Sequence, residues 1–426
     1  MRENIFAAYG VSDAVFEQSE LALERLGPLF QSIEEQAAIK QLRVIRALQK
    51  AGFDEAALSG STGYGMDDRG RTALETAFAE YFRSEAALVR MQFSSGTQVL
   101  ACCLRGLLRP GDHLLIASGL VYDTLKASLG PPTGPEERSE DSLAAFGIGH
   151  SIVDLTPDSR LDIPAILAAV RPETKLVYVQ KSMGYSNRKT LHNKEIAEMI
   201  HELKVKHPEL IVMVDNCYGE MTELEEPTAY GADICAGSLI KNLGGGIADS
   251  GAYVCGRAYL VERVAAQMTA AGVGGEIGPS LGHTRNLVRG FYFAPHVVAE
   301  AMKGALHAAA LMEHYGFVVS PGSEEIRADI VQRIELETPE KLIAFCEEIQ
   351  FASPIDSRFA PVPAPMPGYD CDIIMASGSF VQGSSIELSC DGPLRPPYNA
   401  FLQGGLSFVN SRLGVMRAAE RLLSEV

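Results

Sequence analysis

The order of apolar and polar residues predicts helices in the N-terminal part of the chain. Apolar side chains recur at helical spacing over residues 12–50, and the pair Gly27-Pro28 predicts a break within that stretch. A glycine-rich stretch follows, and its first half has no periodicity, which is typical of a loop. The helical pattern returns from about Thr72 to Phe82. We therefore expect an N-terminal helical segment at residues 1–60.

Short apolar runs alternate with helical patterns between residue 85 and about residue 255. We predict strands at 86–91, 113–117, 175–180, 210–216, 232–239 and 251–256, and helices at 96–108, 162–170 and 193–207. This alternation predicts an α/β fold with a parallel sheet that is covered by helices on both faces. In such sheets, ligands bind at the carboxyl ends of the strands.

The last third of the chain predicts a second, smaller domain. A long helix is expected at residues 296–314, and residues 360–370 (APVPAPMPGYD) form a proline-rich loop. The tail from residue 400 ends in a helix. The predicted division is therefore a helical segment at 1–60, a large ligand-binding domain at 61–295 and a small αβ domain at 296–426.

Composition narrows the functional classes. The 426 residues carry a formal net charge of −17, which argues against a nucleic-acid binder. The first residues lack the apolar core of a signal peptide, and no apolar run is long enough to span a membrane. The eight cysteines are scattered without CxxC spacing, so we expect no metal site and a reduced, cytoplasmic protein.

A lysine at the end of a predicted strand is the first candidate for chemistry. Lys241 lies in GSLIKNLGGG (237–246), where three glycines would let the backbone approach a ligand. In a desolvated pocket its amine would lose charge readily, as a Schiff-base lysine requires. Taken alone, a surface lysine in a flexible loop is the more common explanation.

A carboxylate is the second candidate. Asp215 ends the apolar run LIVMVDN, so it points at the crevice where strands end. Beside a pyridine ring, an aspartate would keep the ring nitrogen protonated. A helix cap, a turn residue or a metal ligand are the alternatives.

Three further features lie at the ends of neighbouring strands. Residues 94–98 (SSGTQ) open a predicted helix, whose N–H groups suit a phosphate, although a plain helix cap explains them equally well. Tyr122 could stack on a planar cofactor or simply pack at the surface. Ser238 could donate to a phosphate or only satisfy the backbone.

These features occur in a set order along the chain: phosphate loop, aromatic residue, aspartate, and lysine followed by glycines. In that order, and in other motifs, the chain resembles the fold-type I pyridoxal-phosphate (PLP) enzymes of the cystathionine-lyase and methionine γ-lyase group, most closely the aluminium-resistance branch. The resemblance spans nearly the whole chain. The matching motifs are TGYGMDDRGR (62–71), FSSGTQ (93–98), QKSMGYSNR (180–188), VDNCYGE (214–220), GSLIKNLGGG (237–246), SLGHTRNLVRGFYFAPHVV (280–298) and DGPLRPPY (391–398).

The resemblance implies the PLP-dependent transferase fold of type I, with a mostly parallel seven-stranded sheet and a smaller C-terminal domain. Lys241 would bind PLP covalently and move protons at the substrate carbons. Asp215 would pair with the pyridine nitrogen, and Tyr122 would stack on the ring. The phosphate would be held by Ser95, Gly96, Thr97 and Ser238.

The resemblance also implies a shared active site in a homodimer or homotetramer. Tyr64, with Arg69 or Arg71, would complete the phosphate site of the neighbouring subunit and act in catalysis beside Lys241 and Tyr122. Arg395 would bind the carboxylate of the amino-acid substrate through a bidentate fork, although a capping or loop arginine is an equal alternative.

Three departures separate this chain from the mainstream lyases. Ile240 replaces a threonine before the lysine, the spacing from Tyr64 to Arg71 is longer, and QKSMGYSNR replaces the asparagine loop. The expected function is a PLP-dependent lyase that breaks a C–S bond of a sulfur-containing amino acid. Transamination, retro-aldol cleavage and a non-catalytic binding or regulatory protein are the alternatives, and neither a nucleic acid nor a membrane is an expected partner.

Overall fold

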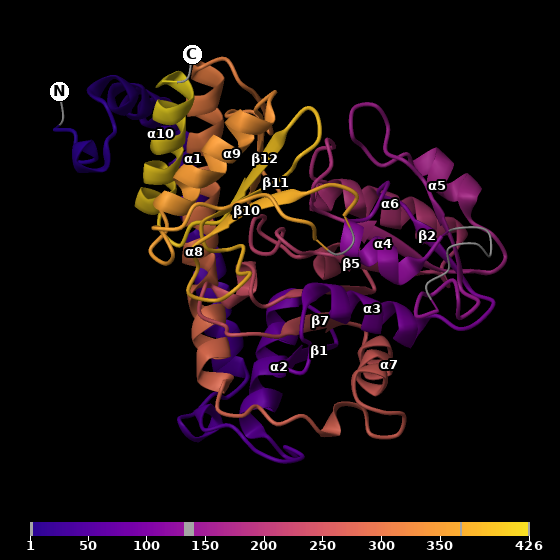
Figure 1. Ribbon diagram of the computed structural model, residues 1–426. Coiled ribbons are helices and arrows are strands. Elements are labelled where there is room, and N and C mark those ends of the chain that lie inside the picture. The colour runs from indigo at the N-terminus through magenta and orange to yellow at the C-terminus, as the bar shows by residue number, and fades with distance from the viewer. Residues whose placement is uncertain (1–2, 132–139, 367–368, 425–426) are drawn as a thin grey trace.

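Two sheets organise the protein. A computed structural model describes residues 3–131, 140–366 and 369–424. Figure 1 shows a large lobe, in which helices surround a central sheet, and a smaller lobe that contains β10, β11, β12, α9 and α10. The long helices α1 and α8 run beside each other from one lobe to the other.

The large sheet has seven strands in the order β1-β7-β6-β5-β4-β2-β3. Strand β7 is antiparallel to both of its neighbours, and the other pairs are parallel. The strands are β1 (Ala86–Arg90), β2 (His113–Ile116), β3 (Gly149–Ile152), β4 (Thr174–Gln180), β5 (Ile211–Asp215), β6 (Ile234–Ser238) and β7 (Ala252–Gly256). The mostly parallel seven-stranded sheet that was expected is therefore confirmed.

Both faces of this sheet are buried, which explains its continuous apolar strands. In β5, Val212 and Val214 pack into one core and Met213 packs into the other. Each such side chain contributes about 1.5–3 kcal/mol when it leaves water. One face is covered by α1 (Asp13–Lys50), α2 (Arg69–Phe82), α5 (Ile163–Ala169), α6 (Asn193–Lys206) and α8 (Thr284–His314), and the other by α3 (Gly96–Leu107), α4 (Asp123–Leu129) and α7 (Ala258–Met268).

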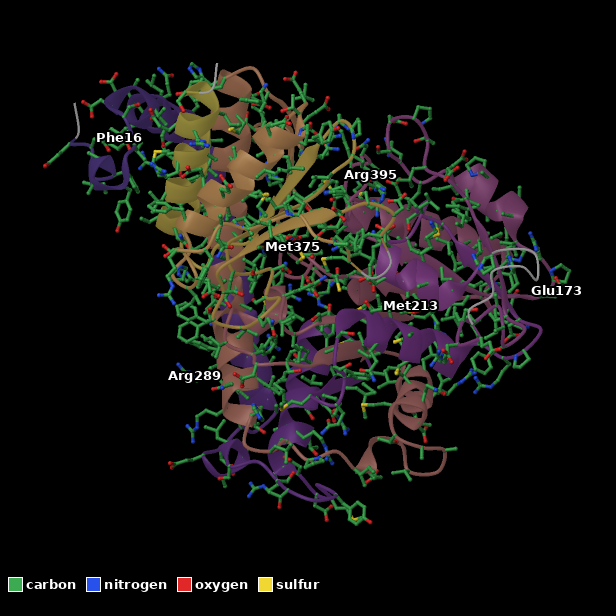
Figure 2. The ribbon with its side chains drawn as sticks, in the orientation of Figure 1. Phe16, Glu173, Met213, Arg289, Met375 and Arg395 are labelled. Atoms are coloured by element: carbon green, nitrogen blue, oxygen red, sulfur yellow. The ribbon has the colours of Figure 1, made fainter. Side chains whose placement is uncertain are left out.

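The small domain is an antiparallel sheet backed by helices. Its strand order is β10-β11-β12-β9-β8. Its elements are β8 (Val318–Ser320), β9 (Val331–Glu335), α9 (Pro339–Phe351), β10 (Ile373–Ser377), β11 (Ser389–Pro393), β12 (Asn399–Gln403) and α10 (Phe408–Ser424). Phe6 and Phe16 from the start of the chain pack into the core of this domain, and Figure 2 shows Phe16 at the same end of the molecule as α10. The boundaries 1–60, 61–295 and 296–426 stay a prediction.

The predicted break at Gly27-Pro28 is wrong. Helix α1 is continuous for 38 residues with Pro28 inside it. Gly27 and Pro28 are exposed, so water can satisfy the carbonyl that the proline leaves without a partner. A buried stripe that includes Leu26 and Ile33 holds the helix on both sides of the proline.

Helix α8 differs from its prediction in the same way. It begins at Thr284 rather than at residue 296 and contains Pro295. Phe291 and Ala294 pack into the large core ahead of the proline and stabilise the extra turns. The prediction also lacked β3, α4 and α7. Only one residue of β3 is aliphatic and α4 has seven residues, so neither presents a strong pattern.

Two global expectations concern the membrane and the cysteines. Among the described residues, no helix combines the length and the apolar character that crossing a membrane requires. All eight cysteines are free, with no disulfide between them, and seven of them are buried. Six of the buried cysteines are small members of the hydrophobic cores, and Cys217 lines the pocket described below.

Candidate active site

A cavity lies at the carboxyl ends of the central strands. Its volume is about 270 Å³. Its lining comes from the ends of β4, β5 and β6, from the starts of α3 and α4, and from the loop before β10. The lining residues are Ser95, Gly96, Thr97, Tyr122, Thr124, Gln180, Ser182, Gly184, Tyr185, Asp215, Cys217, Tyr218, Ser238, Ile240, Lys241 and Tyr369. Six of the residues predicted to bind a cofactor around Lys241 therefore lie in one pocket with it: Ser95, Gly96, Thr97, Tyr122, Asp215 and Ser238.

The start of α3 forms the part of the pocket that suits a phosphate. Ser95 is the N-cap residue, and its hydroxyl accepts a hydrogen bond from the Gln98 N–H at 3.1 Å. A Cβ atom on Gly96 would lie 3.4 Å from the Cβ of Ser238, so a larger residue would crowd the end of β6. The glycine thus lets the helix N-terminus and the Ser238 hydroxyl face one small space, where an anion gains from both.

Tyr122 is fixed by the residues that surround it. Its hydroxyl donates to Thr97 Oγ1 at 3.1 Å, and its backbone N–H donates to Gln180 Oε1 at 2.9 Å. Burial and the nearby Asp215 carboxylate raise the pKa of Tyr122 above its usual range. The ring is therefore a neutral, oriented surface in the pocket, which suits stacking against a planar ligand.

Asp215 is an almost fully buried carboxylate at the end of β5. Its Oδ2 accepts from the Tyr178 hydroxyl at 3.0 Å, and its Oδ1 accepts from the Cys217 N–H at 3.1 Å. Burial raises the pKa of Asp215, while the charge of Lys241 opposes that shift. A buried acid held in this way is suited to bind a protonated ring nitrogen, because the resulting ion pair would relieve the cost of burying its charge.

Lys241 follows β6 and faces the same space. Its Nζ lies 3.8 Å from the centre of the Tyr218 ring, within the range of a cation–π contact. Burial alone would lower the pKa of Lys241, but the acidic groups of Cys217, Tyr218 and Asp215 outweigh burial and raise it. The expectation that desolvation lets this amine lose its charge therefore stays a prediction, because burial and the neighbouring groups act on its pKa in opposite directions.

The residues of this pocket fit PLP. The aldehyde requires a lysine amine, the pyridine nitrogen a carboxylate, the phosphate a set of N–H and O–H donors, and the ring a flat partner. Lys241, Asp215, the start of α3 with Ser238, and Tyr122 supply these four groups in one cavity. Ile240, which replaces the expected threonine, also lines the pocket and adds apolar surface instead of a hydroxyl.

The segment that carries Tyr64, Arg69 and Arg71 does not line this cavity. Tyr64 is 73% exposed, and Arg69 forms an exposed ion pair with Asp54. Arg71 is buried, and it donates hydrogen bonds to the carbonyl oxygens of Gly65, Gly278 and Glu276. The structure of one chain therefore brings none of these three predicted residues to the lysine pocket.

Arg395 also lies outside the lining of the cavity. Its guanidinium forms an ion pair with Asp370 at 2.9 Å, and Figure 2 shows it near the edge of the small domain that faces the large lobe. To bind the carboxylate of a substrate, Arg395 would have to break its ion pair with Asp370.

Several lining residues had no predicted role. Gln180, Ser182, Gly184 and Tyr185 come from the motif 180–188, which was noted only as a departure from the asparagine loop. Its position directly after a strand was a signal that could have marked it as part of the site. Tyr369 had no such signal, because it comes from the proline-rich loop of the small domain. Residues 367 and 368 of that loop lie outside the described residues.

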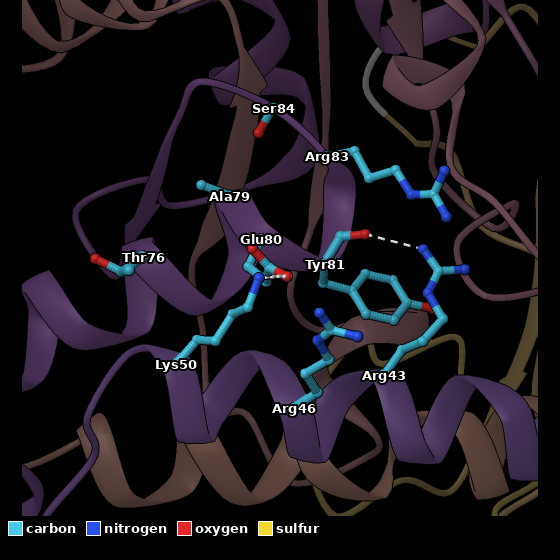
Figure 3. A pocket seen from close by; sticks show the side chains of 9 residues that line it. All are labelled: Arg43, Arg46, Lys50, Thr76, Ala79, Glu80, Tyr81, Arg83 and Ser84. Carbon is cyan, nitrogen blue, oxygen red and sulfur yellow. Dashed lines mark hydrogen bonds and ion pairs between the residues drawn. The ribbon is translucent and has the colours of Figure 1, made fainter.

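A second, larger cavity lies elsewhere, between α1 and the end of α2. Its volume is about 590 Å³, and Figure 3 shows the side chains that line it. Lys50 pairs with Glu80 at 2.6 Å, and Arg43 donates to the Tyr81 carbonyl at 3.2 Å. It shares no lining residue with the lysine pocket and lacks strand-end groups, so the smaller cavity is the candidate active site.

Comparison with known proteins agrees with this site. The family model for methionine gamma-lyase matches residues 15–423. The uncharacterized protein YnbB of Bacillus subtilis (strain 168) is 45% identical over 397 residues, which are 93% of this chain and 94% of that protein. The crystal structure of a carbon-sulfur lyase involved in aluminium resistance from Clostridium novyi NT is 39% identical with a TM-score of 0.93, and the match covers 98% of this chain and 97% of that one.

A more distant structure shares the fold alone. The pyridoxal-5′-phosphate dependent protein YhfS of Escherichia coli is 18% identical with a TM-score of 0.62, over 92% of this chain and 97% of that one. Together with the family match, the pocket identifies pyridoxal 5′-phosphate as the cofactor. The chain belongs to the methionine gamma-lyase family of PLP-dependent carbon–sulfur lyases.

Proposed function

We propose that this protein cleaves the C–S bond of a sulfur-containing amino acid by elimination, releasing a thiol, ammonia and a 2-oxo acid. The observation that carries the proposal is the meeting of Lys241 and Asp215 in one cavity with the helix N-terminus of α3. The name of the Clostridium novyi relative supports the same reaction class.

Each residue of the pocket has one task in this proposal. Bound PLP supplies an electron sink for the negative charge that develops at the substrate carbon. Asp215 keeps a proton at the ring nitrogen, which strengthens that sink. The Lys241 amine, once released by the incoming amino acid, takes a proton from the substrate carbon and returns one later. Tyr122 holds the ring plane, which fixes the bond that is broken.

The neighbouring subunit completes the site in this proposal. Tyr64 and Met66 are 73% and 64% exposed, whereas the backbone of their segment is held by hydrogen bonds from Gly278 and Leu281. Large exposed side chains of this kind are typical of contact surfaces. Tyr64, with Arg69 or Arg71, would reach the phosphate of the partner in a dimer or tetramer, and Arg395 would leave Asp370 to hold the substrate carboxylate.

A substrate panel tests the reaction class. The purified holoenzyme is incubated with methionine, cystathionine, S-alkyl cysteines and serine, and thiol and 2-oxo acid are measured in the same samples. Release of both products in equal amounts supports the proposal. Amino-group exchange without a thiol would indicate a transaminase, and no product from any substrate would contradict a lyase.

A further inference from the structure

Three tyrosines form one part of the lining of the lysine pocket. Tyr185 follows β4, Tyr218 follows β5 and Tyr369 precedes β10, so both domains contribute. We call these three residues the tyrosine wall. The rings of Tyr185 and Tyr369 are 5.8 Å apart, and Tyr218 lies against Lys241. Aromatic faces of this kind favour apolar side chains and thioether sulfur.

A buried carboxylate lies directly behind the tyrosine wall. Asp391, on β11 of the small domain, is 6% exposed. Its Oδ2 accepts hydrogen bonds from the Tyr185 hydroxyl and from Gln403 Nε2, each at 2.8 Å. The Tyr185 hydroxyl is therefore committed to an acid that belongs to the other domain, and the charge of that acid lies one hydrogen bond away from the cavity.

The pH of the experiment decides the charge of Asp391, and the charged form is favoured above its pKa. Burial raises its pKa to about 6, and the hydrogen bonds from Tyr185 and Gln403, together with the charge of Lys241, oppose that rise. The titratable groups whose charges interact with it are Tyr185, Tyr369, Lys241 and Cys390.

Among the described residues that line the cavity, no cationic side chain besides Lys241 is available to offset this charge. Lys241 is the one cationic side chain among the described residues that line the cavity, and it carries the cofactor. A substrate side chain that enters between the tyrosines therefore meets aromatic faces and a negative potential. A second negative charge on that side chain is repelled, because the buried surroundings screen the interaction poorly.

We propose that Asp391, acting through Tyr185, is a specificity-determining residue that admits amino acids with neutral apolar or thioether side chains and rejects those whose side chain ends in a carboxylate. The inference rests on the proposed function, because it assigns a substrate class to the same site. It concerns binding, so it can be measured separately from C–S cleavage.

Two unreactive amino acids of equal chain length provide the test. Norleucine ends in a methyl group and 2-aminoadipate ends in a carboxylate at the same carbon, and neither contains sulfur. The two dissociation constants are measured by isothermal titration calorimetry with the holoenzyme at pH 7.5. The constant for norleucine should be lower than that for 2-aminoadipate by roughly tenfold or more. Equal affinities, or tighter binding of 2-aminoadipate, would overturn the proposal.

The Asp391→Asn variant separates charge from shape. An asparagine can still accept the hydrogen bond from Tyr185, so the wall keeps its geometry. In this variant the dissociation constants of 2-aminoadipate and norleucine should differ by no more than about threefold. Asp356→Asn is the matched control, because Asp356 is an exposed acid of the same domain that does not line the pocket, so the ratio should stay within about twofold. An unchanged ratio in Asp391→Asn would contradict the proposal.

A pH series on the unmodified holoenzyme provides a second measurement in case the variant does not fold. As the pH falls from 7.5 to 5.5, Asp391 takes up a proton and the preference for norleucine should shrink, while 2-aminoadipate keeps its side-chain charge. A preference that does not change with pH would count against Asp391. If the preference is present but no thiol is released from any substrate, the specificity inference stands and the proposed lyase activity fails.

Discussion

The strand ends of the large sheet and the segment 59–71 differ in what fixes their positions. Asp215 and Ser238 end two adjacent strands, so the sheet itself brings them together. The segment 59–71 instead lies against residues 276–283: the Gly278 N–H donates to the Tyr64 carbonyl and the Leu281 N–H donates to the Ser61 carbonyl, each at 2.9 Å. The topology of a parallel sheet brings the ends of its strands together. The position of a loop depends instead on the residues that it is hydrogen-bonded to.

Lys241 should give the largest effect at the sheet edge. Lys241→Ala removes the amine that holds the cofactor and moves protons, so turnover should fall by about 10³-fold or more. Borohydride reduction followed by peptide mapping should label the peptide that contains Lys241 in the unmodified protein and no peptide in the variant. Lys50→Ala is the control, because Lys50 pairs with Glu80 far from the pocket and should leave both readouts unchanged. Full activity of Lys241→Ala would remove its assigned role.

Asp215 should give the next largest effect. Asp215→Asn keeps the size of the side chain but cannot hold a proton on the pyridine nitrogen, so kcat should fall by about 10²–10³-fold. Steady-state kinetics on the best substrate measure this, with the cofactor content read from the absorbance spectrum. The exposed Asp249→Asn serves as control, since the Asp249 carboxylate bonds to His283 and Asn286 and does not line the pocket. A variant with unchanged kcat would show that the ring nitrogen needs no such partner.

Tyr64 tests the role of the segment 59–71. Tyr64→Ala should lower activity by about 10–100-fold even though Tyr64 lies outside the pocket of its own chain. Mixing this variant with Lys241→Ala and allowing the subunits to exchange should restore about a quarter of the activity, because half of the dimers then carry one intact site. Tyr9→Ala, at a tyrosine that is 51% exposed, should change nothing. If mixing restores no activity, Tyr64 does not act across an interface.

Arg395 should give the smallest effect. Arg395→Gln should raise KM by about three- to tenfold with little change in kcat, because a carboxylate contact acts equally on bound substrate and transition state. Arg358→Gln, an exposed arginine of the same domain, is the control. If KM does not change, the ion pair between Arg395 and Asp370 is structural and another group holds the carboxylate.

Much of the pocket could be predicted because its residues lie where strands end. Lys241, Asp215 and Ser238 each follow an apolar run, and Gly96 opens the helix after another, so local patterns and parallel topology suffice to group them. The same reasoning fails for Tyr369, which reaches the cavity from a loop of the small domain. No periodicity along the chain reveals how an antiparallel domain lies over the edge of a parallel sheet.

The remaining differences also have a tertiary origin. The break that Pro28 predicts in α1 is overridden by burial against α8. Folding also brings Tyr218 and Asp215, which are distant from Lys241 in the sequence, into its pocket. Asp391 is the clearest example: an unremarkable residue of the motif 391–398 gains its role only because Tyr185 lies 2.8 Å away.

The packing of the two chain ends has a consequence for synthesis on the ribosome. Phe6, Val11 and Phe16 emerge first, yet their core partners, such as Leu311 and Val415, emerge last. At a typical elongation rate, the roughly 300 residues between Phe16 and Leu311 take about 15–60 s to appear. During this time the large domain can fold, while an apolar N-terminal segment waits without its partners. The order of translation thus gives chaperones time to bind this segment before its partners appear.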